Sequence, residues 1–178
     1  ASGEIWEDNN GRHINAHGGG VLFHEGRYYW FGEHRPAKGF STEVGVTCYS
    51  SPDLCNWTYE GVALPVSSEE GNDIEKGCIM ERPKVIYNAK TGKFVMWFHL
   101  ELKGEGYAAA RAAVAVSDTP AGPYRFVRSC RVNPGVYPQN MTKAERKAKL
   151  DTKDYKTWWT PEWRRAVEQG LFAKRDLK

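Results

Sequence analysis

The sequence has 178 residues and a formal net charge of +3, and aromatic residues make up 13% of it, with seven Trp and nine Tyr. The 11 basic and 6 acidic side chains of residues 134–178 are interleaved at helical spacing, which indicates a solvated helix face and argues against nucleic-acid binding. No stretch approaches the roughly 20 apolar residues of a membrane span. The aromatic excess favours a surface that stacks flat apolar rings, as sugar sites do.

The first predicted unit has four strands within about residues 12–64. Residues 17–33 form two apolar runs around the turn His24-Glu-Gly26, where Gly supplies the positive φ of a hairpin turn. Two more runs follow at residues 44–53 and 58–64. Four strands joined by short turns are typical of one blade of a β-propeller.

The second predicted unit, about residues 79–132, repeats the first. Gly26-Arg-Tyr and Gly92-Lys-Phe lie 66 residues apart, and so do Ser51 and Ser117. Matches in both halves at one spacing indicate an internal repeat, so residues 1–133 are predicted to be two blades. Because a blade cannot bury both of its faces alone, we expect further blades after residue 178. Two unrelated hairpin pairs in a sandwich are the open alternative.

A short helical insertion between blades is predicted over residues 134–178. Thr142-Lys-Ala-Glu145 is a capping box for a helix at 142–149. Thr160 and Pro161 then predict a second helix at 161–169. Three tryptophans here are expected to pack helices rather than to bind sugar: Trp158, Trp159 and Trp163.

Cysteine spacing and the start of the chain bear on its compartment. The four cysteines lack the CxxC spacing of a zinc site, and they allow three disulfide pairings in an oxidising compartment, between which the sequence does not choose. No charged and apolar leader begins the chain, so we expect a secreted or periplasmic protein whose signal peptide has been removed.

Polar side chains are predicted to gather where the first two strands of each unit meet. His17 and Glu81 begin the first strands, and Glu33 and His99 lie near the ends of the second. Carboxylates accept hydrogen bonds from sugar hydroxyls while rings such as Trp30, Trp97 and Tyr107 cover the apolar face. The predicted substrate-binding residues are His17, Glu33, Glu81, Arg82, His99, Glu101 and Tyr107.

Each candidate also has a purely structural interpretation. Glu33 can form an ion pair with Arg35 or Arg82, and Glu81 can pair with Arg82 or Arg111. His17 can instead form a hydrogen bond to the backbone where the first strand begins, and Tyr107 can instead be a core residue.

Four motifs carry a resemblance to a known family: Asn15-Ala-His-Gly-Gly-Gly20, Tyr29-Trp-Phe-Gly-Glu-His34, Glu81-Arg-Pro-Lys-Val-Ile-Tyr-Asn88 and Ala110-Arg-Ala-Ala-Val-Ala-Val-Ser-Asp118. Over about residues 5–133 the chain resembles glycoside hydrolase family 43, most closely the branch with exo-β-1,3-galactanases. The resemblance implies a five-bladed propeller that cleaves arabinogalactan-type glycans with inversion, and glutamates at positions 33 and 81 that grip the terminal sugar.

The resemblance leaves the catalytic residues open. The usual base of the family is an Asp near the start of the first inner strand, where this chain has His17. The general acid is expected beyond Lys178, so the chain alone should be inactive, and Glu81 is a candidate for a catalytic role. No cofactor is implied, although a structural calcium ion in the propeller channel is compatible with the fold. The partner is an oligo- or polysaccharide.

Three other functions stay open at this stage. An α-L-arabinofuranosidase or a β-D-galactofuranosidase of the same family would differ through its loops. A non-catalytic glycan-binding propeller would explain the unusual residue at the position of the base.

Overall fold

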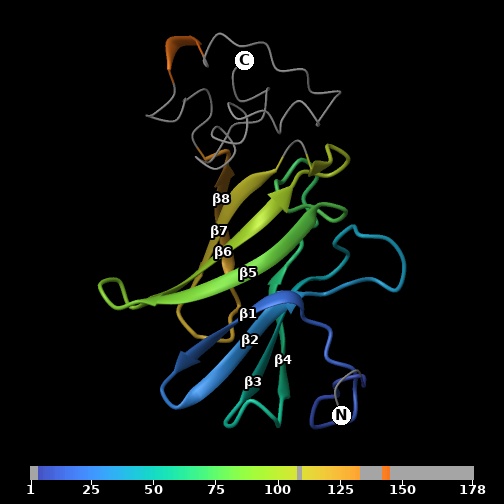
Figure 1. The fold of residues 1–178 in the computed structure, drawn as a ribbon, viewed down its shortest axis with the longest axis vertical. Coiled ribbons are helices and arrows are strands. Elements are labelled where there is room, and N and C mark those ends of the chain that lie inside the picture. Colours follow the sequence, from blue (N-terminus) through green and yellow to red (C-terminus); the bar gives the residue numbers. More distant parts are fainter. Residues whose placement is uncertain (1–3, 108–109, 133–141, 145–178) are drawn as a thin grey trace. The chain divides into compact units, whose positions relative to one another are not determined.

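The computed structural model describes residues 4–107, 110–132 and 142–144, and eight strands within them form two four-stranded antiparallel sheets (Figure 1). The first sheet has the order β1 (His17–His24), β2 (Arg27–Glu33), β3 (Gly45–Ser51), β4 (Thr58–Pro65). The second has the order β5 (Ile79–Asn88), β6 (Lys93–Glu101), β7 (Arg111–Ser117), β8 (Arg125–Cys130). The described residues of 17–64 and 81–132 contain no α-helix, and the all-β prediction is confirmed.

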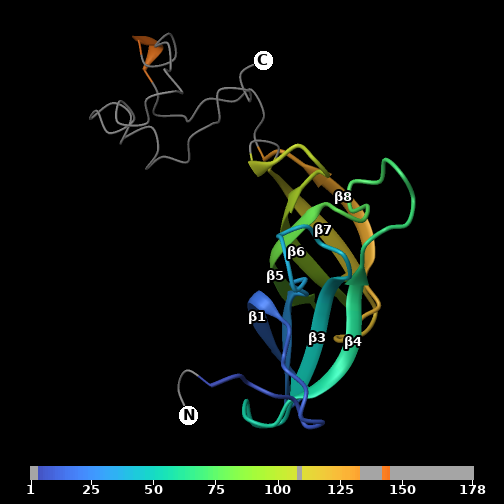
Figure 2. The same ribbon diagram turned by 90° about the vertical axis from the view of Figure 1, so that its right-hand side faces the viewer.

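The two sheets pack through one shared apolar core. Along β6 the residues Phe94, Met96, Phe98 and Leu100 are buried and alternate with less buried ones, as expected for a strand with one face in a core. Phe31 of the first sheet belongs to the same cluster. The first strand of each sheet lies at its edge, and β5 packs against β1 and β2 (Figure 2).

Strand β3 is buried along its whole length because both of its faces are covered. On one side Val46 and Cys48 belong to the core shared with the second sheet. On the other side Tyr49 packs with Ile14 and Ala16 of the segment that precedes β1. This segment therefore covers one face of the first sheet, and it brings Asn15 close to the end of β2 and the start of β3.

The internal repeat extends to irregularities of the strands. The β1–β2 ladder shifts register between His17 and Gly20, and the β5–β6 ladder shifts between Glu81 and Lys84. Both bulges contain a residue with positive φ, Gly18 at 58° and Arg82 at 53°. Such shared bulges indicate that the two sheets are copies of one unit, since bulges bend a strand in a defined way.

Several expectations concern features outside the strands. Of the predicted helix at 142–149, Lys143 and Ala144 are helical and Thr142 precedes them. Residues 145–149 lie outside the described residues, as do 161–169 and the three tryptophans of that segment. All four cysteines are unpaired, with Cys48 and Cys78 buried.

Neither a membrane-spanning helix nor a metal-binding cluster occurs in the described part of the chain. No helix there is long and apolar enough to cross a bilayer. No three side chains of the types His, Cys, Asp and Glu lie there in a position to hold a metal ion.

Candidate functional site

The candidate site lies where β1 and β5 begin. His17 stands opposite Glu33 in the β1–β2 ladder, and Glu81 stands opposite His99 in the β5–β6 ladder. Each sheet thus places one His and one Glu at equivalent positions, in reversed order. The prediction that His17 and Glu81 occupy matching places at the starts of the first strands agrees with this register.

The bulge of β5 sets the position of Glu81 and Arg82. Arg82 has a φ of 53°, a conformation that is costly for a residue with a β-carbon, by about 1 kcal/mol or more. Arg82 adopts this conformation at the place in the second sheet where the first sheet has Gly18. Its guanidinium lies 3.9 Å from Glu81 Oε2 and is 65% exposed.

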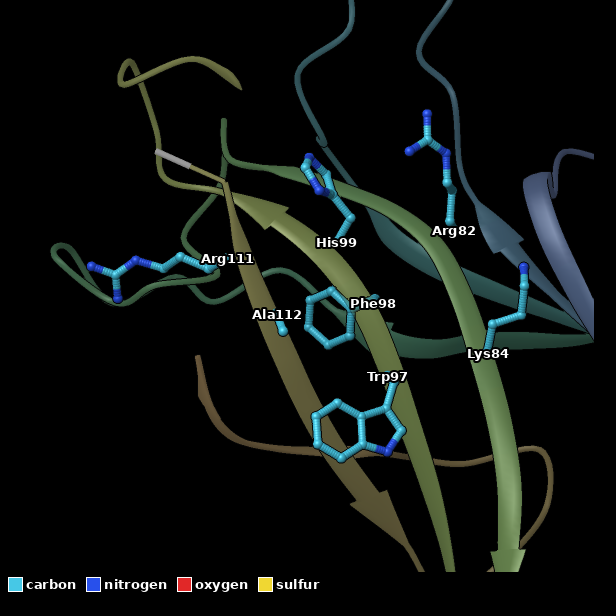
Figure 3. A pocket seen from close by; sticks show the side chains of 7 residues that line it. All are labelled: Arg82, Lys84, Trp97, Phe98, His99, Arg111 and Ala112. Atoms are coloured by element: carbon cyan, nitrogen blue, oxygen red, sulfur yellow. The ribbon is translucent and has the colours of Figure 1, made fainter. Parts of the chain in front are cut away.

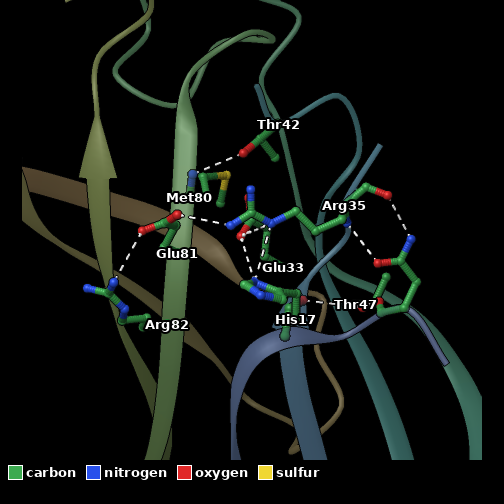
Figure 4. Close-up of polar contacts among 10 residues, drawn as sticks. His17, Glu33, Arg35, Thr42, Thr47, Met80, Glu81 and Arg82 are labelled. Atoms are coloured by element: carbon green, nitrogen blue, oxygen red, sulfur yellow. Dashed lines mark hydrogen bonds and ion pairs between the residues drawn. The ribbon is translucent and has the colours of Figure 1, made fainter. Parts of the chain in front are cut away.

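Arg35 brings the glutamates of the two sheets together (Figure 4). Its Nε lies 3.1 Å from Glu33 Oε2, and its Nη2 donates a hydrogen bond of 3.1 Å to Glu81 Oε1. The same Nε lies 3.3 Å from Nδ1 of His17, which is 3.7 Å from Glu33 Oε2. The four side chains therefore form one charged cluster, to which the two sheets contribute one carboxylate each.

Two buried threonines fix the backbone around this cluster. Thr47 Oγ1 donates a hydrogen bond of 2.6 Å to the carbonyl of Asn15. Thr42 Oγ1 accepts one of 2.9 Å from the amide of Met80, directly before Glu81. Both threonines are fully buried, so these bonds are shielded from water. The first bond holds Asn15 against β3, and the second holds the start of β5 against the segment between β2 and β3.

Glu33 is entirely buried, whereas Glu81 is 19% exposed. Burial raises the pKa of Glu33 to about 7, against the opposing effect of Arg35 and together with the negative charge of Glu81. Near neutral pH this carboxyl therefore changes between its charged and neutral forms. A solvent-borne ligand meets Glu81 first and reaches Glu33 only if His17 or Arg35 shifts.

The raised pKa of Glu33 predicts a pH dependence of stability. The unfolded chain releases this proton near pH 4.5 and the folded chain near pH 7, so the folded state binds more protons in between and its stability falls as pH rises through this window. Over about pH 4.5–7 the free energy of unfolding of the wild type should fall by about 3 kcal/mol relative to Glu33→Gln. Urea denaturation across this range measures the difference.

The matched control for this prediction is Glu43→Gln. Glu43 is 45% exposed and pairs with Lys76 at the surface, so its substitution should leave the pH profile parallel to that of the wild type. A wild-type profile parallel to that of Glu33→Gln would show that Glu33 is not buried as described.

A second polar group lies beside the first on the second sheet. His99 Nε2 and Glu101 Oε1 are 3.1 Å apart, and Glu101 is buried. The ring of Tyr107 lies 5.5 Å from that of His99 and is 70% exposed. The structural interpretation of Tyr107 as a core residue is therefore wrong, and its ring is free to stack on a ligand.

The predicted aromatic wall is divided between opposite faces. Trp30 points away from Glu33 and packs with Trp6 and Trp57 in the aromatic cluster of the first sheet, so its assignment to the sugar site is wrong. Side chains alternate along β2, and Trp30 and Glu33 are three residues apart, which places them on opposite faces.

Trp97 lines a hollow of about 340 Å³ on the second sheet (Figure 3), which adjoins the candidate site through Arg82 and His99. The hollow has cationic and apolar walls and no carboxylate, so it lacks the acceptors that a neutral sugar requires. Its lining residues are Arg82, Lys84, Trp97, Phe98, His99, Arg111 and Ala112.

The structural alternatives for the two glutamates are partly correct. Glu33 pairs with Arg35 as that interpretation required, and Glu81 pairs with Arg82. Arg111 instead lies 3.5 Å from Asp73. Sequence reasoning missed the role of Arg35 as a bridge between the sheets and the contribution of Asn15, although both residues stand within two positions of His17 or Glu33.

Comparison with solved structures relates the chain to β-galactan-cleaving enzymes. A family 43 β-1,3-galactosidase solved with galactodeoxynojirimycin is 73% identical, with a TM-score of 0.85 over 100% of this chain and 52% of its own. An exo-β-1,3-galactanase from Phanerochaete chrysosporium solved with β-1,3-galactotriose is 40% identical, with a TM-score of 0.68 over 73% of this chain and 29% of its own. An exo-β-1,3-galactanase from Clostridium thermocellum is 44% identical, with a TM-score of 0.66 over 77% and 29%.

The chain spans about half the length of the first of these relatives, with 52% of that chain covered, and less of the other two. Its two sheets correspond to the N-terminal part of their five-bladed propeller. No family model and no curated protein matches the chain.

Proposed function

The chain belongs to glycoside hydrolase family 43, and on this premise we propose that the protein is a glycosidase that releases galactose from the ends of β-1,3-galactan. The observation that carries the proposal is the 73% identity over the whole chain to a β-1,3-galactosidase of that family. The neighbours from Phanerochaete chrysosporium and Clostridium thermocellum, both exo-β-1,3-galactanases, support the same linkage and the exo mode of attack.

The exposed parts of the site fit the binding of a galactose residue. Glu81 presents a partly exposed carboxylate whose charge strengthens hydrogen bonds from hydroxyl groups. His17 and Arg82, which are 61% and 65% exposed, add polar contacts beside it. Tyr107 can cover the apolar face of the ring. We assign these residues to substrate binding.

The charge pairing of the glutamates argues against their use as acid and base. An inverting glycosidase needs a protonated acid at the leaving oxygen and a base for the water, about 6.5–9.5 Å apart. Glu33 and Glu81 instead share one guanidinium, and Glu33 has no exposed surface. We propose an inverting reaction in which Glu81 holds the sugar, Glu33 pairs with Arg35 out of reach of solvent, and other residues of the protein transfer the protons.

The natural source of the substrate is proposed to be the β-1,3-galactan chain of plant-type arabinogalactan. A polysaccharide does not cross the cytoplasmic membrane, which favours a secreted or periplasmic location for the enzyme.

The test is to incubate the natural-length protein with β-1,3-galactotriose, with β-1,4-galactobiose and with aryl α-L-arabinofuranoside and β-D-galactofuranoside. We expect release of galactose from the β-1,3-linked substrate alone, with the α-anomer as first product, detected by NMR. Cleavage of a furanoside at a higher rate would overturn the proposed substrate. Tight galactose binding without release would identify a non-catalytic glycan-binding protein.

A further inference from the structure

Arg35 joins two carboxylates that come from different sheets. Its Nε lies 3.1 Å from Glu33 Oε2 and its Nη2 lies 3.1 Å from Glu81 Oε1. A guanidinium is planar and rigid, so two contacts made by one such group fix the separation of the two acceptors. The location of Glu81 relative to β2 therefore depends on where Arg35 is held.

Arg35 follows the end of β2, yet its backbone is held as firmly as that of a strand residue. The side chain of Asn15 donates a hydrogen bond of 2.8 Å to the carbonyl of Arg35 and accepts one of 2.8 Å from its amide. Asn15 is itself fixed through its backbone. Its backbone carbonyl accepts a hydrogen bond from Thr47 Oγ1, and its backbone amide donates one of 3.1 Å to the hydroxyl of Tyr49. The ring of Phe40 lies 5.2 Å from the guanidinium carbon.

The charge balance of the cluster also depends on Arg35. The titratable groups near Glu33 are His17 from β1, Arg35 after β2, the thiol of Cys78 before β5 and Glu81 from β5. Within this set Arg35 carries the one permanent positive charge. Without it the fully buried Glu33 would lie beside a second carboxylate and would itself have no permanent cation in contact, an arrangement that favours uptake of a proton.

We propose that Arg35 is a positioning residue of the site, which holds Glu81 in place for the sugar and supplies a positive charge beside Glu33, and that Asn15 fixes Arg35 for this task. The proposal rests on the proposed function in that Glu81 binds galactose. Arg35 itself acts through the two glutamates and has no assigned contact with the sugar.

The test uses Arg35→Met, which removes the charge, and Arg35→Lys, which keeps it but cannot reach both carboxylates as a fork. The first readout needs no sugar. For each Arg35 variant, the free energy of unfolding is compared with that of the same variant carrying Glu33→Gln. The pH at which this difference stops falling as pH rises is called the pH midpoint. In Arg35→Met this midpoint should move upward by about one pH unit or more, and in Arg35→Lys by less. A merely structural role would lower stability equally at every pH.

The second readout is galactose affinity by calorimetry at pH 7. Arg35→Met should bind galactose roughly tenfold more weakly and Arg35→Lys should recover part of the loss, because one charge-assisted contact remains. Asn15→Ala should shift both readouts in the same direction by a smaller amount, and it carries the test if Arg35→Met does not fold.

The outcomes separate this inference from the proposed function. An unmoved pH midpoint in Arg35→Met, or in Asn15→Ala if Arg35→Met does not fold, overturns the inference. A wild-type protein that binds no galactose overturns the proposed function, while a shifted midpoint still supports the role of Arg35 in the charge of Glu33. Unchanged galactose affinity in Arg35→Met and Asn15→Ala, with a wild type that binds, overturns the positioning of Glu81.

Discussion

Replacing Glu81 by alanine should lower kcat/KM for β-1,3-galactotriose by roughly 10³-fold in the natural-length protein. A carboxylate can accept two charge-assisted hydrogen bonds from hydroxyl groups, each worth about 1.5–3 kcal/mol. Their loss amounts to about 4 kcal/mol, and each 1.36 kcal/mol is tenfold in rate. The substitution also leaves Arg35 and Arg82 without the carboxylate that both approach. Steady-state kinetics with substrate well below KM measures this ratio directly.

Two further variants show whether the loss belongs to the carboxylate. Glu81→Gln keeps the shape and one acceptor oxygen, so it should fall between the wild type and Glu81→Ala. Glu43→Gln removes a surface carboxylate that pairs with Lys76 and should retain wild-type kcat/KM. A kcat/KM of Glu81→Ala within threefold of the wild-type value would contradict the assignment of Glu81 to the binding site.

The repeat was predictable from sequence because its signals are local. Each hairpin has a glycine at the turn followed by a basic and an aromatic residue, and Gly26 and Gly92 do adopt positive φ values of 77° and 65°. Apolar alternation then defines the strands, as in β6. The resemblance to family 43 is confirmed by the comparisons, and so is the assignment of the fold to a propeller.

The gathering of the polar side chains at the candidate site was predictable because the strand register follows from the hairpins. Once His17 and Glu81 are placed at the starts of first strands, pairing carries Glu33 and His99 to their sides. The burial of Glu33 was not predictable in this way. It depends on Arg35 and on the second sheet, both of which reach it through contacts that strand pairing does not specify.

The hydrogen bonds between Asn15 and Arg35 and the position of Trp30 could not be predicted from the pattern of residue types. Asn15 reaches Arg35 across 20 residues through two bonds of 2.8 Å, and such contacts leave no periodic signal. Trp30 was placed in the site because of its residue type, but the segment before β1 covers its face and adds Trp6 to it. The aromatic residues on this face of the first sheet pack together, whereas Tyr107 beside the second sheet is exposed to solvent.

Gly32 is expected to tolerate no side chain. A β-carbon there would lie 2.1 Å from the carbonyl carbon, 2.2 Å from the oxygen and 2.4 Å from the α-carbon of Ala16. These are backbone atoms, so no rotamer change relieves the contact. The segment that contains Ile14 and Ala16 would have to leave the first sheet, and Asn15 would leave Arg35 with it.

Gly32→Ala should therefore lower the free energy of unfolding by more than about 4 kcal/mol, a size that single substitutions reach through a few mechanisms, of which overpacking of the core is one. Gly92→Ala is the matched control, because its β-carbon would meet no atom within 4 Å and its cost is limited to the positive φ of 65°, about 1 kcal/mol. Urea denaturation of both variants gives the comparison. Gly32→Ala should also weaken galactose binding, because the clash separates Asn15 from Arg35. Gly92→Ala should leave galactose binding unchanged, because Gly92 lies at a distant hairpin turn. Equal stability of the two variants would mean that the segment before β1 does not press against β2 at Gly32.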